Sequence, residues 1–348
     1  MIRVLLSSLI LFLPAGWSAL PAHGQEPPPP PTTVAEDLDR ALDLLHQAEQ
    51  DEDNRARYLA EANDLVAAVQ QREPNNVKAD FYLARVLVLA GRSKDALRSV
   101  ERYAKTRQGA NDWEAFKILA DLQVQGTYWT LARGNYQKAA ELNPREPDLY
   151  LGMATCSLQL GKFEDALKQL ETAVNMGTQN PKIYDAYAQV LLRDNQVDRA
   201  LGAAESAVKL AQGDVKNRAG SMRALQELDA RYATLEATLT LAVRKHPQTL
   251  RLWQRGLEII DERLELNGRV ATQRKLAFVN QGIQATQPNV PIELYLKKAQ
   301  LSIEARRRED AESALDEADK IDPTNPLAKQ LRDSLPAATG EPAPRAGQ

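Results

Sequence analysis

Cysteine is almost absent from this sequence: Cys156 is the only one among 348 residues. A lone cysteine cannot form a disulfide within the chain, so no internal disulfide framework is expected to hold the fold. Histidine is also scarce. Of the three histidines, His23 lies in the N-terminal segment, and His46 and His246 are far apart in the sequence. This distribution disfavours a shared histidine metal site.

Catalytic and cofactor motifs are missing as well. The sequence has no H-E-x-x-H, no P-loop, no G-x-S-x-G and no paired C-x-x-C. The densest acidic run, from Glu49 to Asp53, lacks the central glycine that a calcium loop requires, so it is interpreted as a solvated helix end. We therefore expect a protein that is not an enzyme, with no catalytic residue, cofactor or metal ligand.

Aromatic residues make up only 5% of the chain, and neither sign of charge dominates. Low aromatic content is expected where helices pack closely without a large globular core. The 44 basic and 47 acidic residues give a formal charge of −3, which argues against nucleic acid as the main partner. Since no segment alternates strictly between apolar and polar residues, the fold class is predicted to be all-α.

What is present is a repeated pair of helical patterns. The second half of each copy has apolar residues at places i, i+4 and i+7, which form a buried stripe on one helix face. These residues are Ala132, Tyr136 and Ala139; Ala166, Leu170 and Ala173; and Ala200, Ala204 and Ala207. The first halves carry a similar pattern. Gly126, Gly161 and Asn195 lie between the halves, and these residue types adopt positive φ at low cost in turns.

With copies spaced near 34 residues, the chain resembles the tetratricopeptide repeat, a helix–turn–helix unit. Clear copies begin at Val77, Trp113, Pro147, Pro181 and Ile292. The resemblance implies a right-handed superhelical solenoid of antiparallel helix pairs. Cys156 occupies a place in its unit where small residues pack between helices, which predicts a buried thiol; a reactive or intermolecular thiol is the alternative.

The period is less regular before Val77 and between the copies that begin at Pro181 and Ile292. A weaker copy is predicted to begin at Asp43, and the pattern loosens between Lys216 and Pro291. A copy ending at Pro247 is barely visible, and the next stretch is too long for one unit. We therefore divide the helical part into an array over residues 34–213, a degenerate helical region over 214–291 and a C-terminal unit over 292–334.

The two ends differ in composition from the repeats. Residues 1–24 have one early basic residue, a short apolar run and small residues before Gln25, a pattern typical of a secretory signal peptide. A Pro-rich linker follows over residues 25–33, and the Pro, Ala and Gly content of 335–348 is typical of a disordered tail. The predicted location is exported, either periplasmic or secreted. A retained segment, acting as a membrane anchor, is the alternative.

The family's groove-facing places predict a binding surface for a peptide or helix of a partner protein. Carried over unit by unit, they include Lys78, Phe81, Arg85, Leu89, Lys117, Asp121, Leu151, Thr155, Leu158, Asp185, Gln189 and Arg193. The Lys, Arg and Asn signature of the family's carboxylate-clamp variety is not present among them. The competing interpretation is that these residues only pack the superhelix.

The function predicted from these features is a non-enzymatic interaction scaffold of the cell envelope with a protein partner. The alternative is an enzyme-associated or carbohydrate-binding module whose site lies in the atypical region 214–291, where Trp253 is near Arg251, Arg255, Glu258 and Asp261. Core packing is the preferred interpretation of Trp253, and sugar stacking is the other. A scaffold anchored by its N-terminus and facing the cytosol is a third possibility. No feature of the sequence indicates an oligomeric state.

Overall fold

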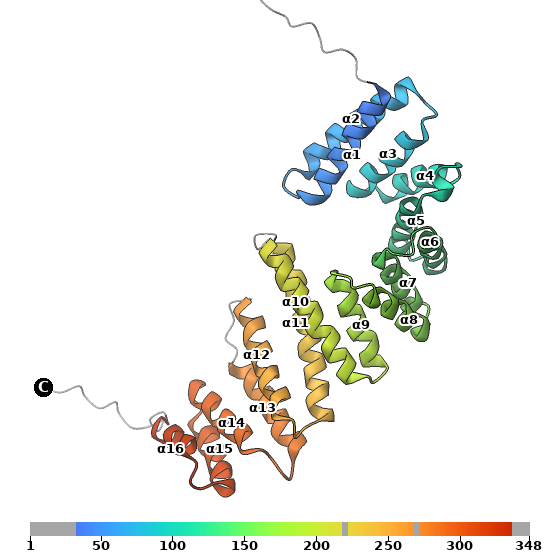
Figure 1. The fold of residues 1–348 in the computed structure, drawn as a ribbon. Helices are drawn as coiled ribbons and strands as arrows, with labels where there is room; N and C mark the ends of the chain where they lie inside the picture. Colours follow the sequence, from blue (N-terminus) through green and yellow to red (C-terminus); the bar gives the residue numbers. More distant parts are fainter. Residues whose placement is uncertain (1–32, 218–221, 267–271, 336–348) are drawn as a thin grey trace, which may run out of the picture. The chain divides into compact units, whose positions relative to one another are not determined.

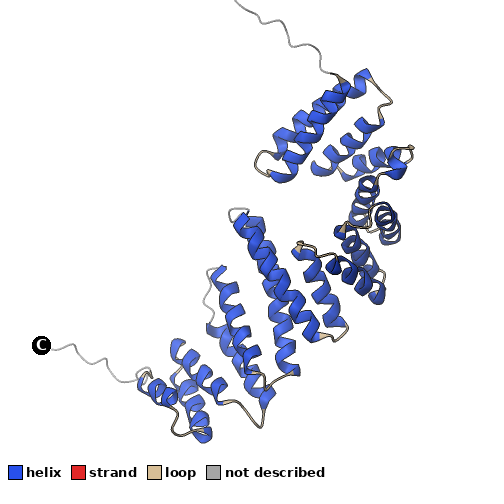
Figure 2. Ribbon diagram, in the orientation of Figure 1, coloured by secondary structure: helices blue, strands red, loops and turns tan. Residues whose placement is uncertain are grey.

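The computed structural model describes residues 33–217, 222–266 and 272–335. Within these ranges the chain is helical throughout, with one short 3-10 helix at Gly109–Asn111 and no strand (Figures 1 and 2). The helices are α1 (Val34–Gln50), α2 (Arg55–Arg72), α3 (Val77–Leu89), α4 (Ser93–Ala104), α5 (Trp113–Gln125), α6 (Trp129–Leu142), α7 (Pro147–Gln159), α8 (Phe163–Asn175), α9 (Pro181–Arg193), α10 (Val197–Asn217), α11 (Met222–Lys245), α12 (Leu250–Leu266), α13 (Thr272–Thr286), α14 (Ile292–Glu304), α15 (Arg308–Ile321) and α16 (Pro326–Asp333). The predicted all-α class and its solenoid of helix pairs are confirmed. The helices belong to two compact units, divided between Ala90 and Gly91, which are described separately below.

Most regular units begin where the sequence places them, because their first helices have strong start signals. The predicted starts at Val77, Trp113, Pro147, Pro181 and Ile292 are the first residues of α3, α5, α7, α9 and α14. For four of these helices the preceding side chain accepts a hydrogen bond from the first turn: Asn76, Asp112, Glu146 and Asn180. Proline at the first position of α7 and α9 adds a preset helical φ.

The turns between paired helices confirm two of the three sequence signals. Gly161 has φ of 72° and Asn195 has φ of 57°. The expectation was wrong for Gly126, whose φ is −83°; the left-handed residue of that turn is Thr127, with φ of 61°. A Cβ at Gly126 would lie 2.7 Å from the Tyr128 ring, which is 61% exposed and has room to turn away.

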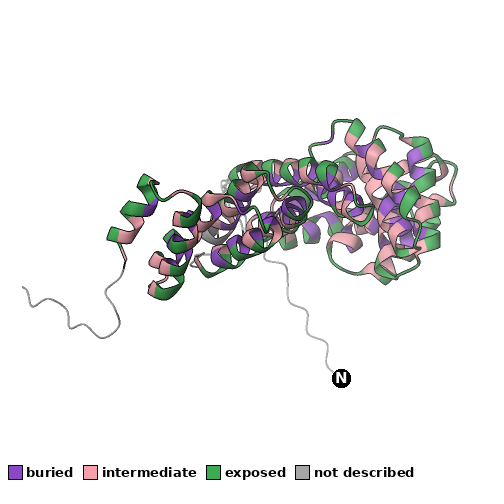
Figure 3. Ribbon diagram, turned by 90° about the horizontal axis from the view of Figure 1, so that it is seen from below, coloured by how far each residue is buried: buried purple, intermediate pink, exposed green. Residues whose placement is uncertain are grey.

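The alanine-rich stripes of the second helices pack as predicted. Ala132, Ala166 and Ala200 are fully buried, as are the alanines that close each stripe. Tyr136 and Leu170 fill the middle places and are also buried. Figure 3 shows such buried positions along the helices, separated by exposed ones. Each unit therefore buries its apolar face against its neighbours, as in other repeat proteins.

In the first compact unit, α1 starts earlier than the weak sequence copy suggested. The predicted start at Asp43 lies inside α1 and is wrong. Thr33 and Glu36 form a capping box, which fixes the helix start at Val34, and no glycine or proline interrupts the helix before Gln50. α1 packs against α2 and α3, and the buried Asp37 of α1 forms an ion pair with Arg72 of α2.

In the second compact unit, the stretch with a loose period forms longer helices. α10 and α11 have 21 and 24 residues, compared with 13 in each regular first helix, and they pack side by side (Figure 1). α11 is one continuous helix where a helix pair ending at Pro247 was barely visible in the sequence. Residues 222–245 contain no Gly, Pro or Asn that would break it. The longer helices explain why the period is stretched.

Candidate protein-binding groove

The first helices of successive units form a common face in the second compact unit. α5 contacts α7, α7 contacts α9, and α9 contacts α11, in addition to the contacts of each helix with its own pair. In helical repeat arrays, such a face supplies an extended binding surface. Eight of the predicted groove residues belong to α5, α7 and α9, and the remaining four belong to α3 in the first unit.

The four residues of α3 have different environments. Lys78 is exposed, and Arg85 forms an ion pair with Glu49 at 2.8 Å between Nη2 and Oε1. Leu89 is half-buried and packs against a cluster formed by α1 and α2. Phe81 is only 5% exposed and belongs to the core, so the packing interpretation describes it better than a role on a surface.

On α5, the two predicted residues interact with each other. Nζ of Lys117 lies 3.0 Å from Oδ2 of Asp121, one helical turn later. Burial acts to lower the pKa of Lys117, but the charge of Asp121 and its hydrogen bond outweigh burial and raise that pKa above its usual value. The hydroxyl of Tyr136 on α6 donates to Oδ1 of Asp121, which fixes this carboxylate at the edge of the face.

On α7, the apolar part of the face is formed by Leu151 and Leu158. Both are half-buried and pack against the main core cluster of this unit. Between them, the hydroxyl of Thr155 donates to the carbonyl oxygen of Leu151 at 2.9 Å. Part of each leucine side chain therefore remains exposed, while the threonine hydroxyl already has an acceptor.

On α9, Asp185 is drawn into contact with α11. Its Oδ2 accepts from Nε2 of Gln189 at 3.0 Å and lies 3.7 Å from Nη1 of Arg231. Asp185 and Arg231 are each 9% exposed, and Oδ1 of the former and Nε of the latter have no hydrogen-bond partner among the described residues. Lys182 also pairs with α11, through Glu227 at 3.4 Å. α11 thus continues the face beyond α9.

Arg231 was not identified from the sequence. It lies in the stretch where the repeat period is lost, so no family position could be assigned to it. The signal that was available is its place on α11, on the same helix face as Glu227 one turn earlier. Only the packing of α11 on α9 places Arg231 beside Asp185 and Glu227 beside Lys182.

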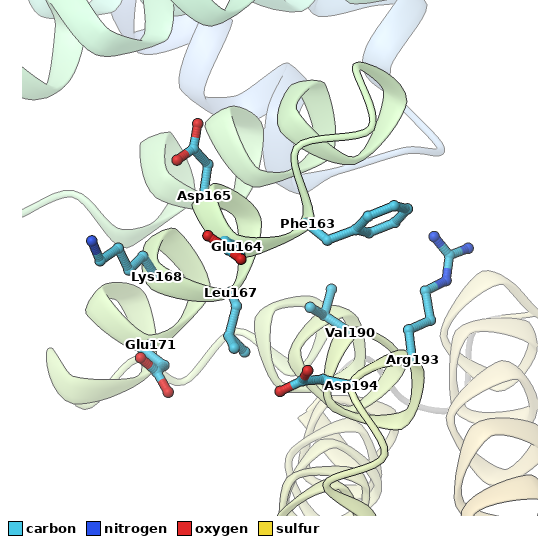
Figure 4. Close-up of a pocket in the computed structure, with 9 residues that line it drawn as sticks. All are labelled: Phe163, Glu164, Asp165, Leu167, Lys168, Glu171, Val190, Arg193 and Asp194. Atoms are coloured by element: carbon cyan, nitrogen blue, oxygen red, sulfur yellow. The ribbon is translucent and has the colours of Figure 1, made fainter.

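Arg193, at the end of α9, lies at a cavity rather than beside Asp185. Its guanidinium is 5.5 Å from the centre of the Phe163 ring, which is 48% exposed. Both line a cavity of about 610 Å³ between α8 and α9 (Figure 4). The other lining residues are Glu164, Asp165, Leu167, Lys168, Glu171, Val190 and Asp194. This cavity was not predicted, because the sequence pattern of α8 indicates only the stripe of residues that the helix buries.

Trp253 is part of the core, as the preferred interpretation expected. It is 1% exposed, its ring centre lies 5.1 Å from that of Phe278, and its indole N–H donates to the carbonyl oxygen of Pro247 at 2.9 Å. It is therefore not available to stack on a sugar. Of its charged neighbours in the sequence, Arg255 bridges Glu258 and Glu262 at 3.1 Å each.

Cys156 is buried, in agreement with its predicted place between helices. Burial is the main cause that raises the pKa of its thiol to about 11, with Arg133 acting in the opposite direction. The thiol therefore stays protonated near neutral pH, which is unfavourable for a nucleophile.

In the described ranges, no group of three or more His, Cys, Asp or Glu is arranged to hold a metal ion. Nor is any helix there long and apolar enough to cross a membrane.

Comparison with known families covers the helices from α6 into α9. Residues 129–190 match the tetratricopeptide repeat family. The chain contains tetratricopeptide repeats. This agrees with the sequence resemblance and with the helix-pair solenoid. Arrays of this kind commonly act as scaffolds for protein interactions through their extended surfaces.

One relative is similar in sequence to part of the chain. Cellulose synthase operon protein C of Pseudomonas fluorescens is 32% identical over 127 residues, which is 34% of this chain. The chain spans only 10% of the length of that protein.

One solved structure shows the same fold over most of the chain, and a second is similar over a shorter part. The C-terminal part of a TPR repeat-containing protein from Cytophaga hutchinsonii is 15% identical, with a TM-score of 0.50. The likeness covers 86% of this chain and 100% of that one. A thermophilic TPR protein of Thermus thermophilus is 19% identical, with a TM-score of 0.41 over 56% of this chain and 99% of that one.

Proposed function

We propose that this protein is a non-enzymatic scaffold whose first-helix face binds a peptide or helix of a partner protein. The observation that carries this proposal is the pair of half-buried leucines, Leu151 and Leu158, at the centre of a face formed by α5, α7, α9 and α11. Their spacing of two helical turns suits the apolar stripe of an amphipathic helix or the alternate side chains of an extended peptide.

The polar surroundings of these leucines support the same proposal. Lys117 and Asp121 border them on α5, while Gln189 and the Asp185–Arg231 pair border them on α9 and α11. The Asp185–Arg231 pair is buried between α9 and α11 and holds the two helices together at this border.

Site-specific photo-crosslinking tests the groove. A benzoylphenylalanine at exposed Gln189 or Gln159 should give a discrete adduct with a partner protein in the producing cells, because both positions border the leucines. The same probe at Leu131 of α6, which is 60% exposed but outside the face, is the matched control. With the probe at Gln159, the substitution Leu158→Glu should abolish the adduct, and so should the milder Gln189→Arg. The circular dichroism spectrum of each variant should stay unchanged, which shows that the helices still form. Equal adducts from Leu131, or adducts that survive both changes, would place the interface elsewhere.

We further propose that the scaffold works in the cell envelope, after export. The signal-like residues 1–24 support export, although they lie outside the described residues. The relative named for a cellulose synthase operon supports an assembly concerned with making or exporting a polymer. In this setting the partner would be another protein of that assembly.

The mature N-terminus gives a direct test of export. Mass spectrometry of the protein purified from its cells should find an N-terminus near Gln25, because the small residues before it form a signal-peptidase site. Fractionation should place the same species in the periplasm or the medium. If the chain keeps Met1 and sediments with membranes, the anchored arrangement replaces the exported one. If it keeps Met1 and is found in the cytosol, export is wrong.

A further inference from the structure

The cavity between α8 and α9 has charged walls that are only partly neutralised. Four carboxylates line it: Glu164, Asp165, Glu171 and Asp194. Asp165 is paired with Arg133 at 2.9 Å, and Glu171 is paired with Arg199 at 2.7 Å. Across the part of the chain that the structure describes, Glu164 and Asp194 form no ion pair, although Asp194 accepts a hydrogen bond from the Gln196 amide.

The two cations that line the cavity do not occupy the space between these two carboxylates. Arg193 stacks on the Phe163 ring at the side of the cavity. Figure 4 shows Lys168 extending in the opposite direction, away from Phe163 and Arg193. The same view shows the Leu167 and Val190 side chains between the carboxyl groups of Glu164 and Asp194.

The floor of the cavity is therefore apolar, and the charged groups on either side of this floor are the carboxylates of Glu164 and Asp194, while Lys168 and Arg193 lie at its edges. Val190 is buried and Leu167 is half-buried, so both present hydrocarbon surface. Asp194 is also the C-cap of α9, where the helix dipole adds partial negative charge. An aliphatic stem with a cationic head matches this arrangement, because the stem covers the floor and the head lies between carboxylates.

We propose that the α8–α9 cavity is a second binding site, one that takes a lysine or arginine side chain from a basic segment of a partner protein. Phe163 closes one side of the site, and its exposed ring packs against the residues that flank the basic one. The site involves α8, a second helix, and so it does not depend on the leucine face of α7. Whether that face binds a partner does not affect this inference.

Peptide binding to the full-length protein tests the site. Fluorescein-labelled peptides GSGKLKGSG, GSGELEGSG and GSGSLSGSG are titrated with the protein and followed by fluorescence anisotropy. The basic peptide should bind at least about tenfold more tightly than the acidic and neutral ones, as one charge-assisted hydrogen bond implies. Combining Glu164→Gln with Asp194→Asn should remove that preference, and Phe163→Ala should weaken the basic peptide.

Matched variants separate the cavity from general surface charge. Glu101→Gln with Asp333→Asn makes the same change in net charge at exposed positions outside the cavity, and Tyr128→Ala removes an exposed aromatic outside it. Neither should affect binding, and Leu158→Glu in the groove should leave it unchanged. The proposal is overturned if the controls weaken binding as much as the cavity variants, or if the three peptides bind alike. It is also overturned if sedimentation shows a dimer that Glu164→Gln dissociates, since the occupant would then be a second copy.

Discussion

Replacing Trp253 by alanine is expected to lower the free energy of unfolding by about 3–5 kcal/mol, the range for truncating a large buried aromatic residue. The side chain is almost fully buried among Phe278, Val243 and Ile260, and it leaves a cavity when it is removed. Gly282 of α13 lies directly against the ring, where a Cβ would be 2.9 Å from the indole, and a glycine has no side chain to fill the cavity.

The loss should be local because a repeat protein is stabilised mainly by contacts between neighbours. Hydrogen exchange measured by mass spectrometry should show reduced protection in α12 and α13, while α5 to α8 keep theirs. Trp253→Phe keeps an aromatic ring but loses the hydrogen bond to Pro247, so it should cost less. Tyr128→Ala, at a position 61% exposed, is the neutral control. A Trp253→Ala protein with unchanged protection would show that this residue does not hold the region together.

The same variant separates a packing role from a sugar-binding role in the atypical region. A sugar-stacking tryptophan stands on the surface, and its removal reduces binding with little effect on stability. Trp253 is enclosed by apolar neighbours, and the nearby Arg255 is bound to carboxylates of its own helix. A large loss of stability therefore supports the packing interpretation and leaves the carbohydrate alternative without its main residue.

The regular part of the fold could be predicted because local signals agree there. In α7 and α9, a capping side chain, a proline at the first position and a repeated buried stripe all indicate the same boundaries. In α11 the opposite holds, since no breaker divides the segment and the stripe no longer follows the repeat. Sequence patterns therefore identified this region as irregular but did not identify the single long helix that it forms.

The candidate sites were less predictable because they depend on contacts between helices. The position of Asp185 within its repeat predicts that it faces the groove. Its pairing with Arg231 depends instead on the packing of α11 on α9. Phe81 was placed in the groove by the same rule, and in this chain it is core. The cavity beside Arg193 depends on the spacing of α8 and α9, for which a single sequence has no signal.

Replacing Gly152 of α7 by alanine is expected to lower the free energy of unfolding by about 2–3 kcal/mol, as overpacking of a core does. The repeat pattern alone does not explain why a glycine stands at this position. A Cβ at this position would lie 2.4 Å from the Tyr136 ring. That ring is buried and its hydroxyl is bound to Asp121, so it cannot move aside without breaking the hydrogen bond. The strain would act between α6 and α7, under the proposed binding face.

Gly134 provides the matched control for this change. It lies in α6, and a Cβ there meets nothing within 4 Å. Gly134→Ala should therefore stabilise the protein by up to about 1 kcal/mol, through helix propensity alone. Urea denaturation followed by circular dichroism compares the two variants. Leucine stands at the place in α8 that matches Tyr136, as Leu170. The double change Gly152→Ala with Tyr136→Leu should therefore cost less stability than the sum of the two single changes, because leucine leaves room for the alanine methyl group. If Gly152→Ala proves as harmless as Gly134→Ala, the close contact between α6 and α7 is wrong.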